Sequence, residues 1–215
     1  LPGIQHVVLC NDFEAHARAA LWGRANPADV DLLVVLPGEG KPGSPTAVVG
    51  AGTGLGKALV LEPQQEGVPP LILASEGGHA EVPFGPEDGD FPRRLAEKLG
   101  RSYLDGDAVL GGTGLAHLVA FHTGKETPAT EAPALAMRHP HVFAQYASLY
   151  GRVCRNFVMD TLALNGVVLT GGMASYLPVA GHPAFAQAFR FCPSLPGIMD
   201  QVPVFHMRSQ AAGLY

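Results

Sequence analysis

The pair Asn11-Asp12 is the first group of residues along this chain that could do chemistry. It follows an apolar run and precedes an Ala-rich stretch. An amide beside a carboxylate can hold adjacent hydroxyls, and the carboxylate can also accept a proton from one of them. Asp12 is therefore a candidate base for activating an alcohol. The alternative is an ordinary helix cap, because Asn and Asp both favour the start of helices.

A second candidate is the segment 50–56, in which every other residue is glycine. It lies between two apolar runs, whereas a dinucleotide fingerprint opens a helix. A P-loop also fails, because Ala51 and Ala58 occupy the positions of its first glycine and its hydroxyl residue. We predict a hairpin whose exposed N–H groups, with the Thr53 hydroxyl, surround an anion. A hairpin that binds nothing is the alternative.

The third candidate, Glu76-Gly77-Gly78-His79, sets a carboxylate and an imidazole around two glycines. A compact polar substrate could lie close to such a backbone, and a plain surface turn is the alternative. No other His or Cys stands at metal-ligand spacing from His79, so we expect no metal site. The chain also has no G-x-S-x-G motif of a serine hydrolase.

The composition limits the partners of these candidate sites. Hydrophobic residues make up 47% of the 215 residues and charged residues 15%, which predicts a globular protein rather than a disordered one. The net charge of −5 argues against nucleic acid and membrane surfaces as partners. Three widely spaced cysteines favour reduced thiols, and no apolar run approaches the roughly 20 residues of a spanning helix. We therefore expect a cytoplasmic protein.

The elements that must position the candidate residues follow from apolar runs and turn residues. The runs predict strands at 6–10, 32–36, 46–49, 57–61, 70–74, 167–169 and 202–206, with 32–36 buried. Helical patterns predict helices at 13–22, 91–99, 115–121, 141–164 and 183–189, and a glycine turn at 111–114. Strands that alternate with helices, with polar corners at the strand ends, predict an α/β fold.

Taken together, these segments resemble the bacterial glucokinase family. The resemblance is carried by Asn11-Asp12-Phe13, the glycine hairpin 50–56, Glu76-Gly77-Gly78-His79 and Leu169-Thr170-Gly171-Gly172, in the same order and at comparable spacing. It implies the two-lobed ribonuclease-H-like (actin-like ATPase) fold, with a mixed sheet and flanking helices. It also implies transfer of the γ-phosphoryl group of ATP, bound with Mg²⁺, to the 6-hydroxyl of glucose or a related hexose, and a homodimer.

The resemblance also assigns roles to residues. It makes Asp12 the catalytic base, and it places the sugar against Asn11, Asp12, Glu76 and His79. Asp107 stands where the family usually has a Glu that binds the sugar, so this carboxylate is one methylene shorter and sugar preference stays open. The resemblance gives the phosphates to Gly52, Thr53 and Gly54. It places Gly171 and Gly172 at the turn near the adenosine.

One motif of the family has no counterpart here, namely the Asp-x-Gly-Gly-Thr phosphate hairpin that precedes the Asn-Asp corner. We therefore expect residues 1–21 to form the last strand of the small lobe and a connecting helix. Residues 22–215 would form the large lobe, without the phosphate-loop lobe and the C-terminal helix. The 215-residue piece alone is then expected to be inactive. The alternative function is a non-catalytic sugar- or nucleotide-binding regulatory module of the same fold.

Overall fold

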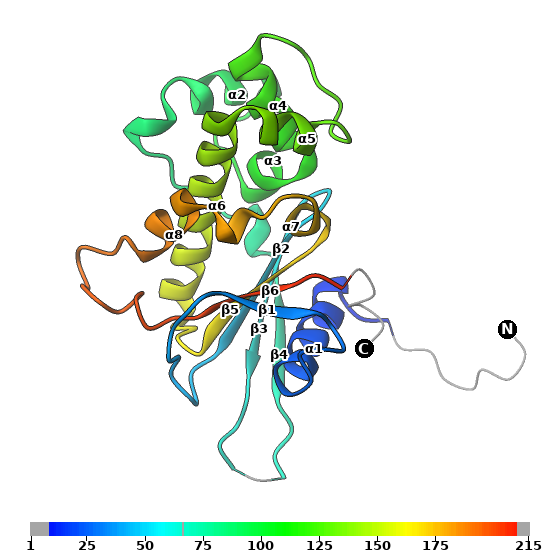
Figure 1. The fold of residues 1–215 in the computed structure, drawn as a ribbon, viewed down its shortest axis with the longest axis vertical. Helices are drawn as coiled ribbons and strands as arrows, with labels where there is room; N and C mark the ends of the chain where they lie inside the picture. The colour runs from blue at the N-terminus through cyan, green and yellow to red at the C-terminus, as the bar shows by residue number, and fades with distance from the viewer. Residues whose placement is uncertain (1–8, 66, 210–215) are drawn as a thin grey trace, which may run out of the picture.

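The computed structural model describes residues 9–65 and 67–209 (Figure 1). The strand predicted at 6–10 lies mostly outside these residues. Its last two residues, Leu9 and Cys10, belong to no helix or strand.

A six-stranded mixed sheet forms the centre of the molecule. Its order is β1-β6-β5-β2-β3-β4. The strands are β1 (Leu32–Leu36), β2 (Thr46–Ala51), β3 (Leu55–Leu61), β4 (Leu71–Ser75), β5 (Gly166–Thr170) and β6 (Val204–Met207). The pairs β2·β5 and β5·β6 are parallel, and the other pairs are antiparallel. The parallel pairs place the ends of β2 and β5 at the same edge, next to the turn that joins β2 to β3.

The prediction that strand 32–36 is buried was wrong. The segment forms β1 within the predicted bounds, but β1 is an edge strand, and among the described strands it pairs with β6 alone. Leu33 is 41% exposed and Val34 62% exposed. A continuous apolar run is typical of a strand covered on both faces, and no element of the described chain covers this part of β1 sufficiently to bury those side chains.

Helices cover both faces of the sheet, to different extents. Helix α1 (Asp12–Ala25) packs its alanines against Val48, Ala58 and Val168 on one face. The larger core lies on the other face, where α6 (Pro140–Thr161) is the longest element and packs against α8 (Pro183–Arg190). The remaining helices are α2 (Phe91–Leu99), α3 (Gly106–Leu110), α4 (Gly112–Thr123), α5 (Ala132–Arg138) and α7 (Gly172–Tyr176). In Figure 1, α2 to α5 gather above the sheet.

The glycine turn predicted at 111–114 is also wrong in part, because α4 already begins at Gly112. Gly111 both ends α3 and starts α4. Gly114 is helical, and a Cβ there would lie 2.6 Å from the Ala108 carbonyl oxygen of α3. Glycine at this position therefore allows two consecutive helices to pack closely and does not mark a loop.

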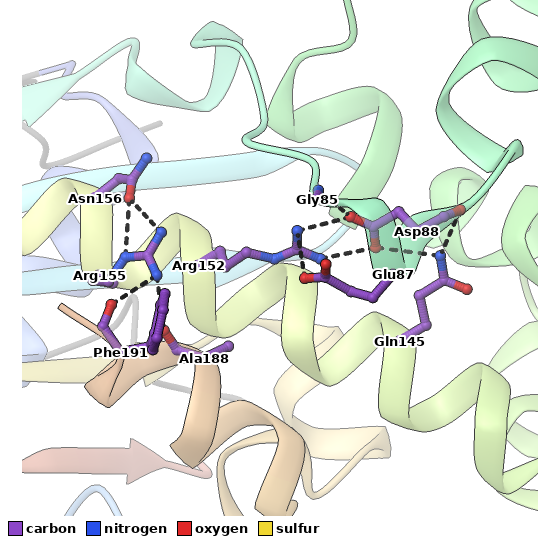
Figure 2. A network of polar contacts seen from close by, with 9 residues as sticks. All are labelled: Gly85, Glu87, Asp88, Gln145, Arg152, Arg155, Asn156, Ala188 and Phe191. Atoms are coloured by element: carbon purple, nitrogen blue, oxygen red, sulfur yellow. Dashed lines mark hydrogen bonds and ion pairs between the residues drawn. The ribbon is translucent and has the colours of Figure 1, made fainter. Parts of the chain in front are cut away.

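A buried ion pair fixes the segment that follows His79 to the long helix α6 (Figure 2). Arg152 of α6 and Asp88 are 6% and 2% exposed, and their nearest charged atoms are 2.7 Å apart. Asp88 also accepts a hydrogen bond from the N–H of Gly85 at 2.7 Å. Figure 2 shows that Gln145, which precedes Arg152 in α6, also reaches the Asp88 carboxylate. A buried charge without its partner is costly, so this pair holds the loop in one position.

Phe13 packs directly on the glycine hairpin. Gly50 and Gly56 are cross-strand partners in β2 and β3, and a Cβ on either would meet the Phe13 ring. For Gly50 the separation would be 2.8 Å, and for Gly56 the Cβ would overlap the ring. The absence of side chains at these two glycines therefore leaves space for the Phe13 ring and lets the first turn of α1 pack on the hairpin. We call this space the seat of Phe13.

This seat gives a stability prediction. We expect Gly56→Ala to lower the free energy of unfolding by about 1–3 kcal/mol, the usual cost of overpacking. Gly52→Ala is the matched control on the same hairpin, because a Cβ there meets nothing within 4 Å. Urea unfolding of both variants measures the difference, and equal stability of the two variants would contradict the seat.

Candidate functional site

A cavity of about 380 Å³ opens where the hairpin, the start of α1 and the end of β5 meet. Every residue that the sequence and the resemblance singled out for the site lines it: Asn11, Asp12, Gly52, Thr53, Gly54, Glu76, His79, Asp107, Gly171 and Gly172. These residues come from segments up to 161 positions apart, from 11 to 172. The tertiary structure thus brings all of them to one place.

Asn11 and Asp12 both contact the first free N–H of α1, since the Asp12 Oδ1 also accepts a hydrogen bond of 2.9 Å from the Phe13 N–H. Asn11 is the residue before α1, and its Oδ1 accepts a hydrogen bond of 2.8 Å from the Phe13 N–H. Asn11 is therefore the helix cap. Asp12 is the first residue of the helix, is exposed, and lines the cavity. Its carboxylate is placed where it could accept a proton from a bound hydroxyl.

The segment Glu76-Gly77-Gly78-His79 follows β4 and forms a single 3₁₀ turn over Gly77–His79. The turn sits tightly on the hairpin, since a Cβ on Gly78 would overlap the carbonyl oxygen of Leu55. His79 Nε2 lies 3.7 Å from Glu76 Oε2, and its Nδ1 lies 3.8 Å from Asp107 Oδ2. An imidazole between carboxylates offers several donors and acceptors to a polyhydroxy ligand.

Asp107 joins this group from α3 and is also bound to the hairpin. Its Oδ1 accepts a hydrogen bond of 2.6 Å from the Leu55 N–H, and a Cβ on Gly54 would lie 2.7 Å from the same oxygen. One carboxylate oxygen therefore holds the hairpin, and the other faces His79. The short Asp side chain is suited to this contact because its carboxylate lies directly against a glycine.

The tip of the hairpin lines the cavity with Gly52, Thr53 and Gly54, and some of its backbone groups are already hydrogen-bonded. The Gly52 N–H donates to the Gly54 carbonyl at 2.8 Å, and the Gly112 N–H donates to the Gly52 carbonyl at 2.9 Å. Beside it, Gly171 has φ +87°, a conformation that favours glycine, and a Cβ there would lie 2.6 Å from the Ala51 carbonyl oxygen. Two glycine turns thus lie side by side and leave room for a ligand at the backbone.

A second cavity of about 620 Å³ adjoins the first and shares Gly52, Thr53 and Gly172 with it. Its other walls come mainly from apolar side chains of α5 and α7, including Met137, Met173 and Tyr176. A flat, weakly polar ring system fits such a lining. Sequence reasoning placed Gly172 near the adenosine but missed the apolar walls of this cavity, because the apolar side chains of α5 and α7 belong to no motif.

Sequence reasoning also missed His16 and Asp105. His16 lines the cavity four residues after Asp12, and this spacing on a helix was the signal that could have revealed it. Burial lowers its pKa, and the charge of Asp12 opposes that effect. Asp105 caps α3 by accepting from the Ala108 N–H at 2.9 Å, and its Oδ2 lies 3.9 Å from His79 Nδ1.

Among the described residues, no group of three His, Cys, Asp or Glu side chains is arranged to hold a metal ion. Within the same residues, none of the helices combines the length and the apolar character needed to cross a membrane.

A family model for glucokinase matches residues 2–215. The chain belongs to the glucokinase family. The glucokinase of Sinorhizobium medicae (strain WSM419) is 31% identical to it over 228 residues, which cover 99% of this chain and 64% of that relative. The chain therefore spans less than two thirds of the length of that glucokinase.

Solved structures of sugar kinases share the fold. The crystal structure of a glucokinase from an Antarctic psychrotroph matches with a TM-score of 0.79 at 23% identity, over 95% of this chain and 65% of that one. A ROK family glucokinase from Streptomyces griseus, in complex with glucose and AMPPNP, matches with a TM-score of 0.56 at 18% identity, over 97% and 65%. The predicted α/β fold of the glucokinase family, a mixed sheet with flanking helices, is confirmed.

The double role of Asp107 in this glucokinase-family chain can be tested by stability. Asp107→Ala leaves the Leu55 N–H without its acceptor, so we expect a loss of about 1–3 kcal/mol in the free energy of unfolding. Asp107→Asn keeps an acceptor oxygen and should lose less than half of that. Urea unfolding compares them, and equal losses would show that the contact with Leu55 does not hold the hairpin.

Proposed function

We propose that the protein represented by this chain is an ATP-dependent hexose kinase that phosphorylates the 6-hydroxyl of glucose or a related hexose. The observation that carries this proposal is the convergence on one cavity of a carboxylate at a helix start, a polar group around His79 and two glycine turns. Membership of the glucokinase family supports it, and favours a kinase over a regulatory module.

Each part of the cavity has a role in this reaction. Glu76, His79, Asp107 and Asn11 bind the hydroxyls of the sugar. Asp12 accepts the proton of the 6-hydroxyl while that oxygen forms a bond to the γ-phosphorus and the bond from phosphorus to the leaving ADP breaks. The protein mainly positions these groups, because phosphoryl transfer needs little covalent chemistry from the enzyme.

We assign the nucleotide to the adjoining side of the site. The backbone of Gly52, Thr53 and Gly54 would hold phosphates, with Gly171 and Gly172 at the turn near the adenosine. The apolar second cavity, which shares residues with both turns, fits the base. The complex of the Streptomyces griseus glucokinase with glucose and AMPPNP supports ATP as the donor. Mg²⁺ would enter with ATP as part of the substrate.

The other features of the whole protein stay predictions. We propose that residues 1–21 belong to a strand and linking helix at the small lobe, and that residues 22–215 form the large lobe. A homodimer, a cytoplasmic location, and the absence of nucleic acid and membrane partners are expected on the grounds given from the sequence. Sedimentation of the complete gene product tests the dimer.

We expect Asp12→Asn in the complete gene product to lower kcat by about 10²–10⁴-fold, because an amide keeps the shape but cannot accept the proton. Glucose affinity should change much less. Glu14→Gln is the control, since Glu14 lies on the same helix and pairs with Arg18 instead. A coupled kinase assay measures both, and an unchanged kcat for Asp12→Asn would remove Asp12 as the base.

The sugar site gives a separate prediction. Glu76→Gln and Asp107→Asn should each weaken glucose binding by about 5–150-fold, equivalent to about 1–3 kcal/mol for a lost hydrogen bond to a charged group. Glu126→Gln is the control, because Glu126 follows α4 and forms an ion pair with Lys98 of α2, outside the cavity. Calorimetric titration with glucose decides, and equal affinities across the variants would mean that these side chains do not share a sugar site.

A further inference from the structure

The cavity proposed for phosphoryl transfer contains no Lys or Arg among the described residues that line it. It does contain the carboxylates of Asp12, Glu76 and Asp107. A phosphoryl group carries negative charge on its outer oxygens and needs donors there. Donors on these walls must therefore come from backbone N–H groups and neutral side chains.

His16 and His79 are the two imidazoles on these walls. His79 lies within 4 Å of carboxylate oxygens of Glu76, Asp105 and Asp107. His16 is on the opposite side of the site, on α1, one turn after Asp12. Its ring lies beside Phe13, with 5.2 Å between the ring centroids, so the seat of Phe13 on the hairpin also fixes His16.

A hydrogen bond joins His16 to a buried hydroxyl of β5. His16 Nδ1 lies 3.2 Å from Oγ1 of Thr170, which is 1% exposed and directly precedes Gly171. A buried hydroxyl needs an acceptor for its proton. Within the part of the chain that the structure describes, His16 Nδ1 is the side-chain atom that hydrogen-bonds this hydroxyl. When the hydroxyl donates to Nδ1, the neutral ring carries its hydrogen on Nε2.

Burial lowers the pKa of His16, which favours this neutral form, although Asp12 opposes the effect. A neutral imidazole with Nε2–H is a donor that needs no charge on the ring. His16 lines the same cavity as Asp12 and the hairpin tip 52–54. Asp12 and this tip are where the proposed function places the attacking hydroxyl and the phosphates.

We propose that His16 donates a hydrogen bond from Nε2 to an oxygen of the phosphoryl group during its transfer, and that Thr170 holds the ring in the tautomer that makes this donation. This proposal rests on the proposed kinase function. It assigns to His16 and Thr170 roles that none of the sequence motifs suggested.

Variants separate donation from simple packing. His16→Leu removes both ring nitrogens and should lower kcat by about 10–1000-fold, the range for loss of one donor to a developing charge. The KM for glucose should stay within about twofold, as for a contact made only in the transition state. His16→Gln can accept from Thr170 and donate toward the cavity, so it should recover most of the lost kcat. His117→Leu is the control, since His117 is also half-buried but lies on α4 outside this cavity.

Nitrogen-15 NMR of the histidines in the complete wild-type protein gives a readout that does not depend on turnover or on a variant folding. We expect His16 to be protonated on Nε2, and we expect the Nε2 resonance to shift when glucose and MgAMPPNP are added. The resonances of His117 should not move. In Thr170→Val the preference for the Nε2–H tautomer should weaken.

The outcomes distinguish the two proposals. If the complete wild-type gene product has no kinase activity, the proposed function is overturned. The NMR titration then still tests contact between His16 and the nucleotide. An active enzyme in which His16→Leu has wild-type kcat overturns the donation. So does an Nδ1–H tautomer, an Nε2 resonance that ignores bound MgAMPPNP, or a His16→Gln variant as impaired as His16→Leu.

Discussion

The contact of the Phe13 ring with the paired glycines of the β2–β3 hairpin is the constraint on which the site depends. The ring occupies the space of two absent side chains, Gly50 and Gly56, and so fixes the first turn of α1 against the sheet. Asp12 precedes this residue and His16 follows it by one turn, so both inherit their positions from it. A larger residue at either glycine would move the helix and, with it, the carboxylate.

The tip of the same hairpin also contacts α3, the turn Gly77–His79 and the start of α4. Asp107 binds the Leu55 N–H, Gly78 lies on the Leu55 carbonyl, and Gly112 donates to Gly52. Each of these contacts uses a backbone group of the hairpin, which is accessible because the hairpin has so few side chains. One short segment therefore sets the relative positions of the side chains proposed to bind the sugar, the proposed base and the glycine turns.

Charge shapes the site as strongly as packing does. Carboxylates surround His79, and the described walls of the cavity hold no basic side chain of Lys or Arg. Such walls suit a polyhydroxy ligand, and any anionic group bound there would depend on backbone N–H groups and neutral donors. The buried ion pair of Arg152 with Asp88 lies outside the cavity and holds the loop after His79.

The sequence by itself predicted several of the elements and the cavity-lining residues that belong to motifs, because these depend on local order, but it predicted neither α5 nor α7. The pattern of apolar residues and turn residues predicted the bounds of β1 and α2 as observed. The residues that the motifs singled out all line the cavity. Exposure of β1, the helical state of Gly112 and Gly114, and the presence of His16 beside Thr170 were decided only by the tertiary structure. The second depends on the close packing of the consecutive helices α3 and α4. The first and the third depend on neighbours distant in sequence, β6 beside β1 and β5 against α1, the latter separated by 154 residues at the His16–Thr170 contact. Local pattern carries no information on such neighbours, since they are brought together by the sheet order and not by the chain.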